Sequence, residues 1–180
     1  MSQVILDSMA MKRTLGRMAH EIVEEAGGAQ DLVVIGILRR GWPLAKRLAF
    51  LMAQIEDQPI PHGKLDISQY RDDASKSEDN KTDIPFSVVG RRVILVDEVL
   101  QTGRTIRAAL DAIMKMGRPE SIQLAILVDR GDRQLPIQPD FCGITIDIGS
   151  GEKVEVMLTE YSDSDVVYVT SGDKNLQLDL

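Results

Sequence analysis

Cysteine and histidine are scarce in this chain of 180 residues, which contains Cys142, His20 and His62 and no others. A single cysteine cannot form an intrachain disulfide and excludes a metal site built from several cysteines. The two histidines lie far apart and show no metal-ligand spacing, so we predict no metal-binding side chains. Gly-x-Ser-x-Gly is also missing, which leaves a hydrolase with a nucleophile elbow without support.

Long apolar runs and an excess of basic residues are missing as well. No stretch has the length of a membrane span, and the N-terminus lacks the pattern of a signal peptide, so we expect a cytoplasmic protein without membrane contact. The net charge of −7 weighs against general affinity for nucleic acid, although a local basic face can exist. The hydrophobic content of 43% is ordinary for a globular protein, and the length predicts a single domain over residues 1–180.

Hydrophobic periodicity predicts strands and helices in alternation over most of the chain. Met11, Leu15, Met18 and Ile22 recur at helical spacing and form one apolar stripe. The alternation indicates right-handed crossovers and an α/β fold with a mainly parallel sheet. The expected helices are residues 9–26, 43–53 and a third ending near 116. The expected strands are 32–38, 65–70, the apolar run that begins at Arg92 and ends in Asp97 and Glu98, 121–128, 144–148, 154–158 and 166–169. The last three strands extend the sheet edge or form a small cap, and the polar tail 170–180 is expected to fray.

The most specific feature is the segment 92–105, in which an apolar run ends in Asp97 and Glu98 and a Thr-Gly-Arg-Thr turn opens a helix. Backbone N–H groups at a helix N-terminus can hold a phosphate dianion, and the two carboxylates can accept hydrogen bonds from a ribose diol. Such a segment predicts a site for a phosphorylated sugar, whereas an acid pair alone would fit a solvated strand end. The residues predicted to bind are Asp97, Glu98, Val99, Leu100, Gln101, Thr102, Gly103, Arg104 and Thr105.

Two other predicted strands end in polar loops, Arg39-Arg40-Gly41 and Asp129-Arg130-Gly131. Ligands of parallel sheets collect beyond the carboxyl ends of the strands, so we expect one cleft bounded by all three loops. Arginine offers a planar fork of donors that suits a pyrophosphate, although a solvated basic turn is the alternative. Positive charge grows on a ribose ring as its leaving group departs, and an acid pair stabilises it. We assign catalytic roles to Asp97, Glu98 and Arg40.

The segment 71–82 is almost wholly polar and is predicted to be a mobile lid. A lid would exclude water from a reactive glycosyl cation, and Tyr70 and Arg71 could reach the pyrophosphate when it closes. An inert surface loop is the alternative. A pyrophosphate carries enough charge to require Mg²⁺, which we expect to be bound mainly through substrate oxygens and water.

The motif at 92–105 is that of a loop that binds phosphoribosyl pyrophosphate (PRPP), and the chain as a whole resembles the PyrR family of pyrimidine-operon regulators and uracil phosphoribosyltransferases. Tyr70-Arg71-Asp72-Asp73 and Asp129-Arg130-Gly131 separate this family from other phosphoribosyltransferases. The remaining similar stretches are residues 4–7, 19–21, 36–37, 40–41, 44–48, 65–67, 82–85, 117–119, 121–125, 127–128 and 135–137.

The resemblance implies a type I phosphoribosyltransferase fold with a small hood made by the chain ends. It implies conversion of uracil and PRPP to UMP and pyrophosphate, with the base near Asp129, Arg130 and Val154. It also implies UMP- or UTP-dependent binding to the leader of pyrimidine-operon mRNA, and assembly as a dimer or higher oligomer. A regulator with little catalysis, and an enzyme acting on a different base, are the alternatives.

The sequence departs from the family pattern at several positions. Leu38-Arg39 replaces the usual basic residue and threonine, Glu98 replaces aspartate, Gln101 stands where an aromatic is common, and the lid is shorter. On the implied RNA surface, Gly16, Asp132, Gln138 and Ile144 replace hydroxyl, histidine or basic residues, which lowers the expected affinity for RNA. The basic residues that remain are Lys12, Arg13, Arg17 and His20 on the first predicted helix, together with Arg130 and Arg133. For Lys12, Arg13 and Arg17, the solvated side of an amphipathic helix is the alternative reading.

Overall fold

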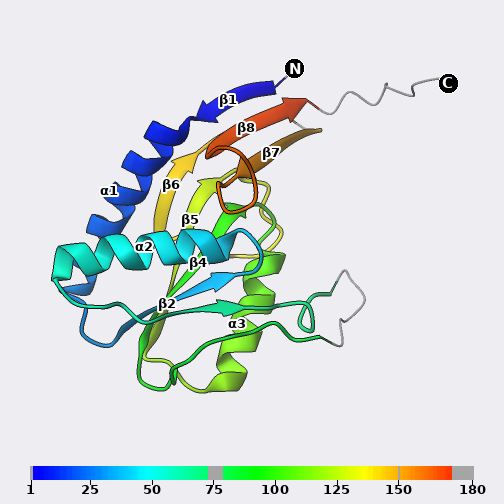
Figure 1. The fold of residues 1–180 in the computed structure, drawn as a ribbon. Helices are drawn as coiled ribbons and strands as arrows, with labels where there is room; N and C mark the ends of the chain where they lie inside the picture. The colour runs from blue at the N-terminus through cyan, green and yellow to red at the C-terminus, as the bar shows by residue number, and fades with distance from the viewer. Residues whose placement is uncertain (1, 73–78, 150, 172–180) are drawn as a thin grey trace.

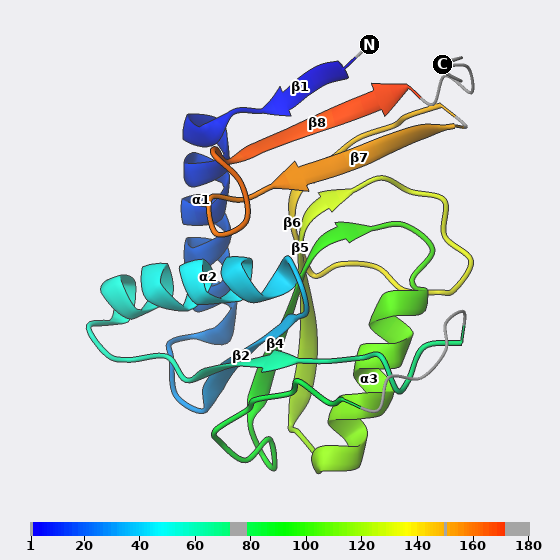
Figure 2. The same ribbon diagram turned by 45° about the vertical axis from the view of Figure 1, so that its right-hand side comes forward.

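The computed structural model of the protein describes residues 2–72, 79–149 and 151–171, which form two sheets and three helices (Figures 1 and 2). Helices α1 and α2 lie on one side of the larger sheet and α3 on the other. The elements are β1 (Ser2–Leu6), α1 (Ser8–Ala26), β2 (Leu32–Ile37), α2 (Gly41–Glu56), β3 (His62–Leu65), β4 (Arg92–Leu100), α3 (Arg104–Met116), β5 (Ser121–Asp129), β6 (Phe141–Thr145), β7 (Glu152–Met157) and β8 (Val166–Ser171).

The larger sheet is parallel throughout, with the strand order β3-β2-β4-β5-β6. All six residues of β2 are buried, as expected of a strand covered on both faces. Alternate residues of β4 enter the two halves of the core: Ile94 packs with α1 and α2, whereas Leu95 packs with α3. The predicted α/β fold with a mainly parallel sheet is therefore confirmed.

Helix α1 shows how closely local signals place an element. The Asp7 side chain accepts a hydrogen bond from the Ala10 amide at 2.7 Å and caps the helix start, and Gly27 ends the helix in the left-handed region at φ 65°. The predicted apolar stripe is buried against the sheet, with Met11 and Ile22 fully inaccessible. The predicted helix at 9–26 is confirmed to within one residue.

The strand predicted at residues 65–70 is wrong, because β3 ends at Leu65. Beyond that point the Asp66 carboxylate accepts hydrogen bonds from the amides of Ser68 (2.9 Å) and Lys81 (3.1 Å). These bonds hold the chain in a turn, which competes with strand pairing. The strand predicted at 144–148 also lies earlier, at β6, because the buried Phe141 and its neighbours pair with β5.

Strands β7 and β8 form a second, antiparallel sheet with β1, in the order β1-β8-β7 (Figure 1). Segments from the two ends of the chain thus build a small hood beside the main sheet, as the resemblance implied. Thr170 and Ser171 belong to β8, which corrects the expectation that they fray, while 172–180 lie outside the described residues. The centre of the predicted lid, 73–78, also lies outside them. Among the described residues, no helix is long and apolar enough to cross a membrane.

Candidate active site

The carboxyl ends of β2 and β4 meet at a cleft of about 520 Å³, lined by Arg39, Arg40, Glu98 and Tyr161. Arg39 and Arg40 lie in the turn between β2 and α2, and Glu98 lies near the end of β4. We expected three loops to bound one cleft, and residues from two of them line this one, whereas Asp129-Arg130-Gly131 is not among its lining residues. Tyr161 comes from the connection between β7 and β8 and was not predicted.

Gly41 brings the arginine turn into direct contact with the end of β4. A Cβ atom at this position would lie 2.5 Å from the Val96 carbonyl oxygen and 3.2 Å from Asp97 Oδ1. Only glycine permits so close an approach, because real Cβ contacts do not fall below about 3.0 Å. The Leu38–Arg39 peptide bond at the start of this turn is cis. The close approach at Gly41 holds the arginines beside the two predicted acids.

The two acids lie in different environments. Asp97 is 5% exposed and accepts a hydrogen bond from the Glu98 amide at 2.9 Å, whereas Glu98 is half-buried and lines the cleft. Burial, and then the adjacent Glu98 carboxylate, raise the pKa of Asp97 well above its usual range. A cationic group arriving beside this pair would favour the ionised form of Asp97. The pair is therefore suited to stabilising positive charge.

The Thr-Gly-Arg-Thr turn forms a second hollow of about 210 Å³ next to the acids. It is lined by Val99, Leu100, Gln101, Thr102, Gly103, Thr105 and Ile106. Gly103 has φ 90°, and the first hydrogen bond of α3 runs from the Arg107 amide to the Gly103 carbonyl at 2.9 Å. The preceding amides lack acceptors within the helix, and the positive end of the helix dipole lies here. The hollow has the chemistry of a phosphate site.

The phosphate turn is supported by residues 133–137. The Thr102 carbonyl accepts hydrogen bonds from the amides of Gln134 (3.0 Å) and Leu135 (3.1 Å). The Arg104 side chain contacts Gln134 Oε1 at 2.8 Å and the Asp72 carboxylate at 2.7 Å. The Arg104 amide donates to the Thr102 hydroxyl at 3.3 Å, while the Arg104 side chain connects the turn to the segment that follows Tyr70.

The predicted base-binding residues lie where β5 meets the hood. Partial burial acts to raise the pKa of Asp129, but hydrogen bonds from Arg133 (2.6 Å) and the Gly131 amide (3.0 Å) outweigh it and lower that pKa. Arg130 donates to the Glu152 carbonyl at 3.1 Å and so joins the end of β5 to β7, the strand that carries the half-buried Val154.

The residues predicted to contact RNA do not form one surface. Arg133 points inward and donates to Asp129, to the Ile137 carbonyl (2.7 Å) and to the Gln101 carbonyl (3.0 Å). Its guanidinium is engaged in holding the loop after β5, which corrects the expectation that it offers a phosphate contact. The remaining four residues, Lys12, Arg13, Arg17 and His20, are exposed on α1, and Arg17 is paired with Glu21 at 2.8 Å.

Tyr70, predicted to belong to the lid, packs against α3. Its carbonyl accepts a hydrogen bond from Arg107 at 2.9 Å, and the Lys115 ammonium lies 4.7 Å from its ring centroid. The ring joins the part of the core under α3. Arg71, the other residue predicted to belong to the lid, directly follows Tyr70 in the chain.

Comparison with known proteins agrees with this geometry. The family described as "Phosphoribosyl transferase domain" matches residues 2–158. Two curated relatives are each named "Bifunctional protein PyrR". The one from Bacillus velezensis is 48% identical over 176 residues, covering 94% of this chain and 97% of the relative. The one from Deinococcus radiodurans is 50% identical over 167 residues, covering 91% of each.

A solved structure, the hypoxanthine phosphoribosyltransferase of Trypanosoma cruzi, superimposes with a TM-score of 0.73. It covers 95% of this chain and 97% of the other at 17% identity, and so shares the fold. The fold and the site together define a phosphoribosyltransferase. The chain belongs to the phosphoribosyl transferase family and, within it, to the bifunctional PyrR proteins.

Proposed function

We propose that the protein transfers the phosphoribosyl group of PRPP to uracil, giving UMP and pyrophosphate. The observation that carries this proposal is the meeting of the Arg39-Arg40 turn with Glu98 in one cleft, beside the phosphate turn. Arginines, paired acids and helix amides match the three parts of PRPP: pyrophosphate, ribose diol and 5-phosphate. The names of the curated relatives support the pyrimidine substrate.

In this reaction, the bond between the ribose C1 atom and the pyrophosphate oxygen breaks, and a bond from C1 to the uracil N1 atom forms. The electron pair leaves with pyrophosphate, and the N1 proton is released from the base. Arg39 and Arg40 would bind the leaving group, and Asp97 and Glu98 would stabilise positive charge on the ring. Asp129, Arg130 and Val154 would hold the base at the edge of the hood.

Magnesium is part of the same proposal. Among residues 2–72, 79–149 and 151–171, no group of three or more histidine, cysteine or acidic side chains could hold a metal ion. Asp97 and Glu98 supply hard oxygen ligands but too few for a cage, which fits Mg²⁺ carried largely by substrate oxygens and water. When bound, Mg²⁺ neutralises charge on the pyrophosphate.

A steady-state assay with uracil, PRPP and Mg²⁺ tests the enzyme function. We expect UMP formation in the wild type and a loss on the order of 10²-fold in kcat for Asp97→Asn, which removes the charge while keeping the shape. Glu24→Gln, an exposed change on α1, is the control and should leave the rate unaltered. Absence of both UMP formation and PRPP binding in the wild type would refute the proposal, and faster reaction with hypoxanthine would refute the assignment of the base.

We further propose that α1 contributes to binding of leader mRNA in the presence of UMP or UTP. The exposed Lys12, Arg13, Arg17 and His20 lie on this one helix, and the relatives are named as bifunctional. Each lysine or arginine that contacts a phosphate adds about one unit to the slope of log affinity against log salt concentration. Filter binding at several salt concentrations should show a shallower slope of log affinity against log salt concentration for Arg13→Ala than for the wild type. An RNA affinity that is changed neither by UMP nor by this substitution would refute RNA recognition by α1.

A further inference from the structure

The connection between β7 and β8 forms a compact turn that reaches from the hood to the cleft. The carbonyl of the buried Leu158 accepts hydrogen bonds from the amides of Tyr161 (2.8 Å) and Ser162 (2.9 Å). The Ser162 hydroxyl also donates to this carbonyl, at 2.9 Å. The turn therefore presents Tyr161 in a defined position on its outer side.

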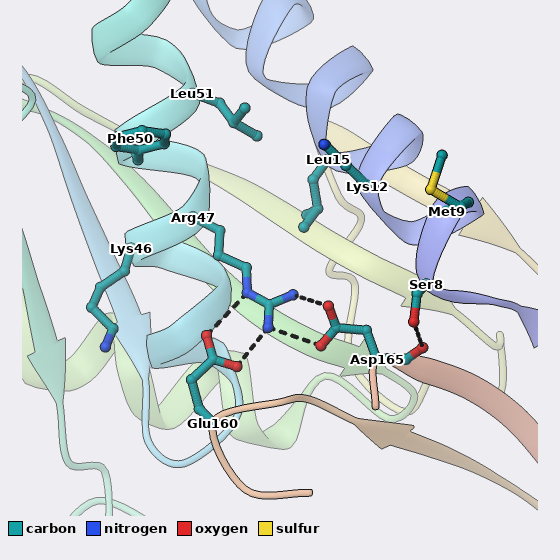
Figure 3. A pocket seen from close by; sticks show the side chains of 10 residues that line it. All are labelled: Ser8, Met9, Lys12, Leu15, Lys46, Arg47, Phe50, Leu51, Glu160 and Asp165. Atoms are coloured by element: carbon teal, nitrogen blue, oxygen red, sulfur yellow. Dashed lines mark hydrogen bonds and ion pairs between the residues drawn. The ribbon is translucent and has the colours of Figure 1, made fainter. Parts of the chain in front are cut away.

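Arg47 of α2 anchors this turn at both of its ends (Figure 3). Its guanidinium donates to both carboxylate oxygens of Asp165, each at 2.9 Å, and to both of Glu160, at 3.0 and 2.6 Å. The Thr159 hydroxyl accepts a further hydrogen bond at 3.0 Å. Such bidentate contacts between an arginine and a carboxylate fix the orientation of the turn relative to α2 and also stabilise it.

The anchoring helix is also the helix that begins at the arginine turn. Arg47 lies six residues after Gly41, a separation of roughly 9 Å along a helix axis. One rigid element thus carries both the cleft arginines at its start and the anchor of the Tyr161 turn. The distance between Tyr161 and the arginine turn is therefore set by α2.

Tyr161 contacts Arg39 at the edge of the cleft. Its hydroxyl donates to the Arg39 carbonyl at 3.5 Å, and the Arg39 Cζ atom lies 5.7 Å from the ring centroid. Both side chains line the cleft with Arg40 and Glu98. Within the described part of the chain, the Arg39 guanidinium forms no ion pair, so its charge is available to an anionic ligand.

We propose that Tyr161 is a positioning residue, which holds the Arg39 guanidinium in the cleft for the pyrophosphate group of the donor substrate. This inference rests on the proposed function, because the pyrophosphate is that of PRPP. A free arginine side chain loses rotamer freedom when it binds, and a ring that already restricts it reduces that loss. The expected contribution is about two- to fivefold in affinity, as for a cation–π contact at an exposed site.

The test compares Tyr161→Ala, Tyr161→Phe, Arg39→Ala and the double variant in the full chain. For Tyr161→Ala we expect the KM for PRPP and the inhibition constant of inorganic pyrophosphate to rise by about two- to fivefold, with the KM for uracil unchanged. Tyr161→Phe keeps the ring and loses only the long hydroxyl contact, so its KM for PRPP and its inhibition constant for pyrophosphate should stay within about twofold of the wild-type values. The double variant should equal Arg39→Ala, because Tyr161 acts through Arg39.

Phe50→Ala is the matched control, since Phe50 is an exposed aromatic residue of α2 that lies outside the cleft. It should leave both KM values unchanged. Effects of Tyr161→Ala and Arg39→Ala that multiply in the double variant, or a change in the KM for uracil instead, would overturn the role of Tyr161.

Direct binding of inorganic pyrophosphate with Mg²⁺, measured by calorimetry, separates this inference from the proposed function. Tight binding that is weakened by Tyr161→Ala supports the inference even when no UMP forms. Formation of UMP with pyrophosphate affinity unaltered by Tyr161→Ala refutes the inference alone. Absence of pyrophosphate binding in the wild type refutes the inference, whereas the proposed function fails only when UMP formation and PRPP binding are absent as well.

Discussion

Substitution of Gly41 by alanine tests whether the contact between the arginine turn and β4 is essential. The new Cβ atom would start 2.5 Å from the Val96 carbonyl oxygen and 3.1 Å from the Asp97 Cα atom. Both neighbours are backbone atoms of a buried central strand, so they cannot rotate away as a side chain could. The turn itself must move outward by at least about 0.5 Å to reach an acceptable contact.

The displacement has separate effects on stability and on catalysis. Overpacking of this kind costs about 1–3 kcal/mol, which corresponds to a Tm lower by roughly 2–12 °C for a chain of this size. The arginines move with the turn while Asp97 and Glu98 stay on β4. Misplacement of reacting groups by a fraction of an ångström to one ångström costs on the order of 10- to 100-fold in rate. We therefore expect kcat/KM for PRPP to fall by that factor.

Gly16→Ala provides the matched control, because an added Cβ in this helix interior meets no atom within 4 Å. The substitution should stabilise α1 by about 0.5–1 kcal/mol and leave kcat/KM unchanged. Thermal unfolding, followed by steady-state kinetics at a temperature well below the transitions it shows, separates the two effects. A Gly41→Ala protein that is folded and retains wild-type kcat/KM would refute the claim that this close approach aligns the site.

Two further predictions concern the acids. The raised pKa of Asp97 means that its ionised form is disfavoured in the folded state, so Asp97→Asn should increase Tm at neutral pH although it lowers kcat. The gain in Tm should vanish as pH falls below about 4, where the unfolded carboxyl is protonated. A loss of Tm at pH 7 would contradict this. Asp129 and Asp165 have lowered pKa values, because hydrogen bonds from Arg133 and Arg47 outweigh their partial burial. Their stabilising contribution is complete above about pH 4 and is lost as pH falls through their folded-state pKa values, so Tm should drop steeply below pH 4, and less steeply in Asp165→Asn.

Local sequence determined those parts of the fold and the site that depend on neighbouring residues. Burial of both faces of β4 follows from its continuous apolar run, and the hollow at Gly103 follows from a turn that needs a positive φ before a helix. The capping signals at Asp7 and Gly27 placed the start and the end of α1 for the same reason. The meeting of strand ends at one edge of the sheet could also be anticipated, because parallel strands direct their carboxyl ends to one edge.

Only the tertiary structure decided which side chains occupy the cleft and which leave it. Tyr161 meets Arg39 across 122 positions of the chain, and no motif around Tyr161 announces that contact. Arg133 looked like a surface cation in the sequence, yet the carboxylate of Asp129 and two carbonyls draw it inward. Periodicity and turn chemistry act over a few residues, whereas these contacts depend on how α2, β5 and the hood pack together. The sequence by itself therefore determined the phosphate turn and the acids, and packing between distant elements decided what surrounds them.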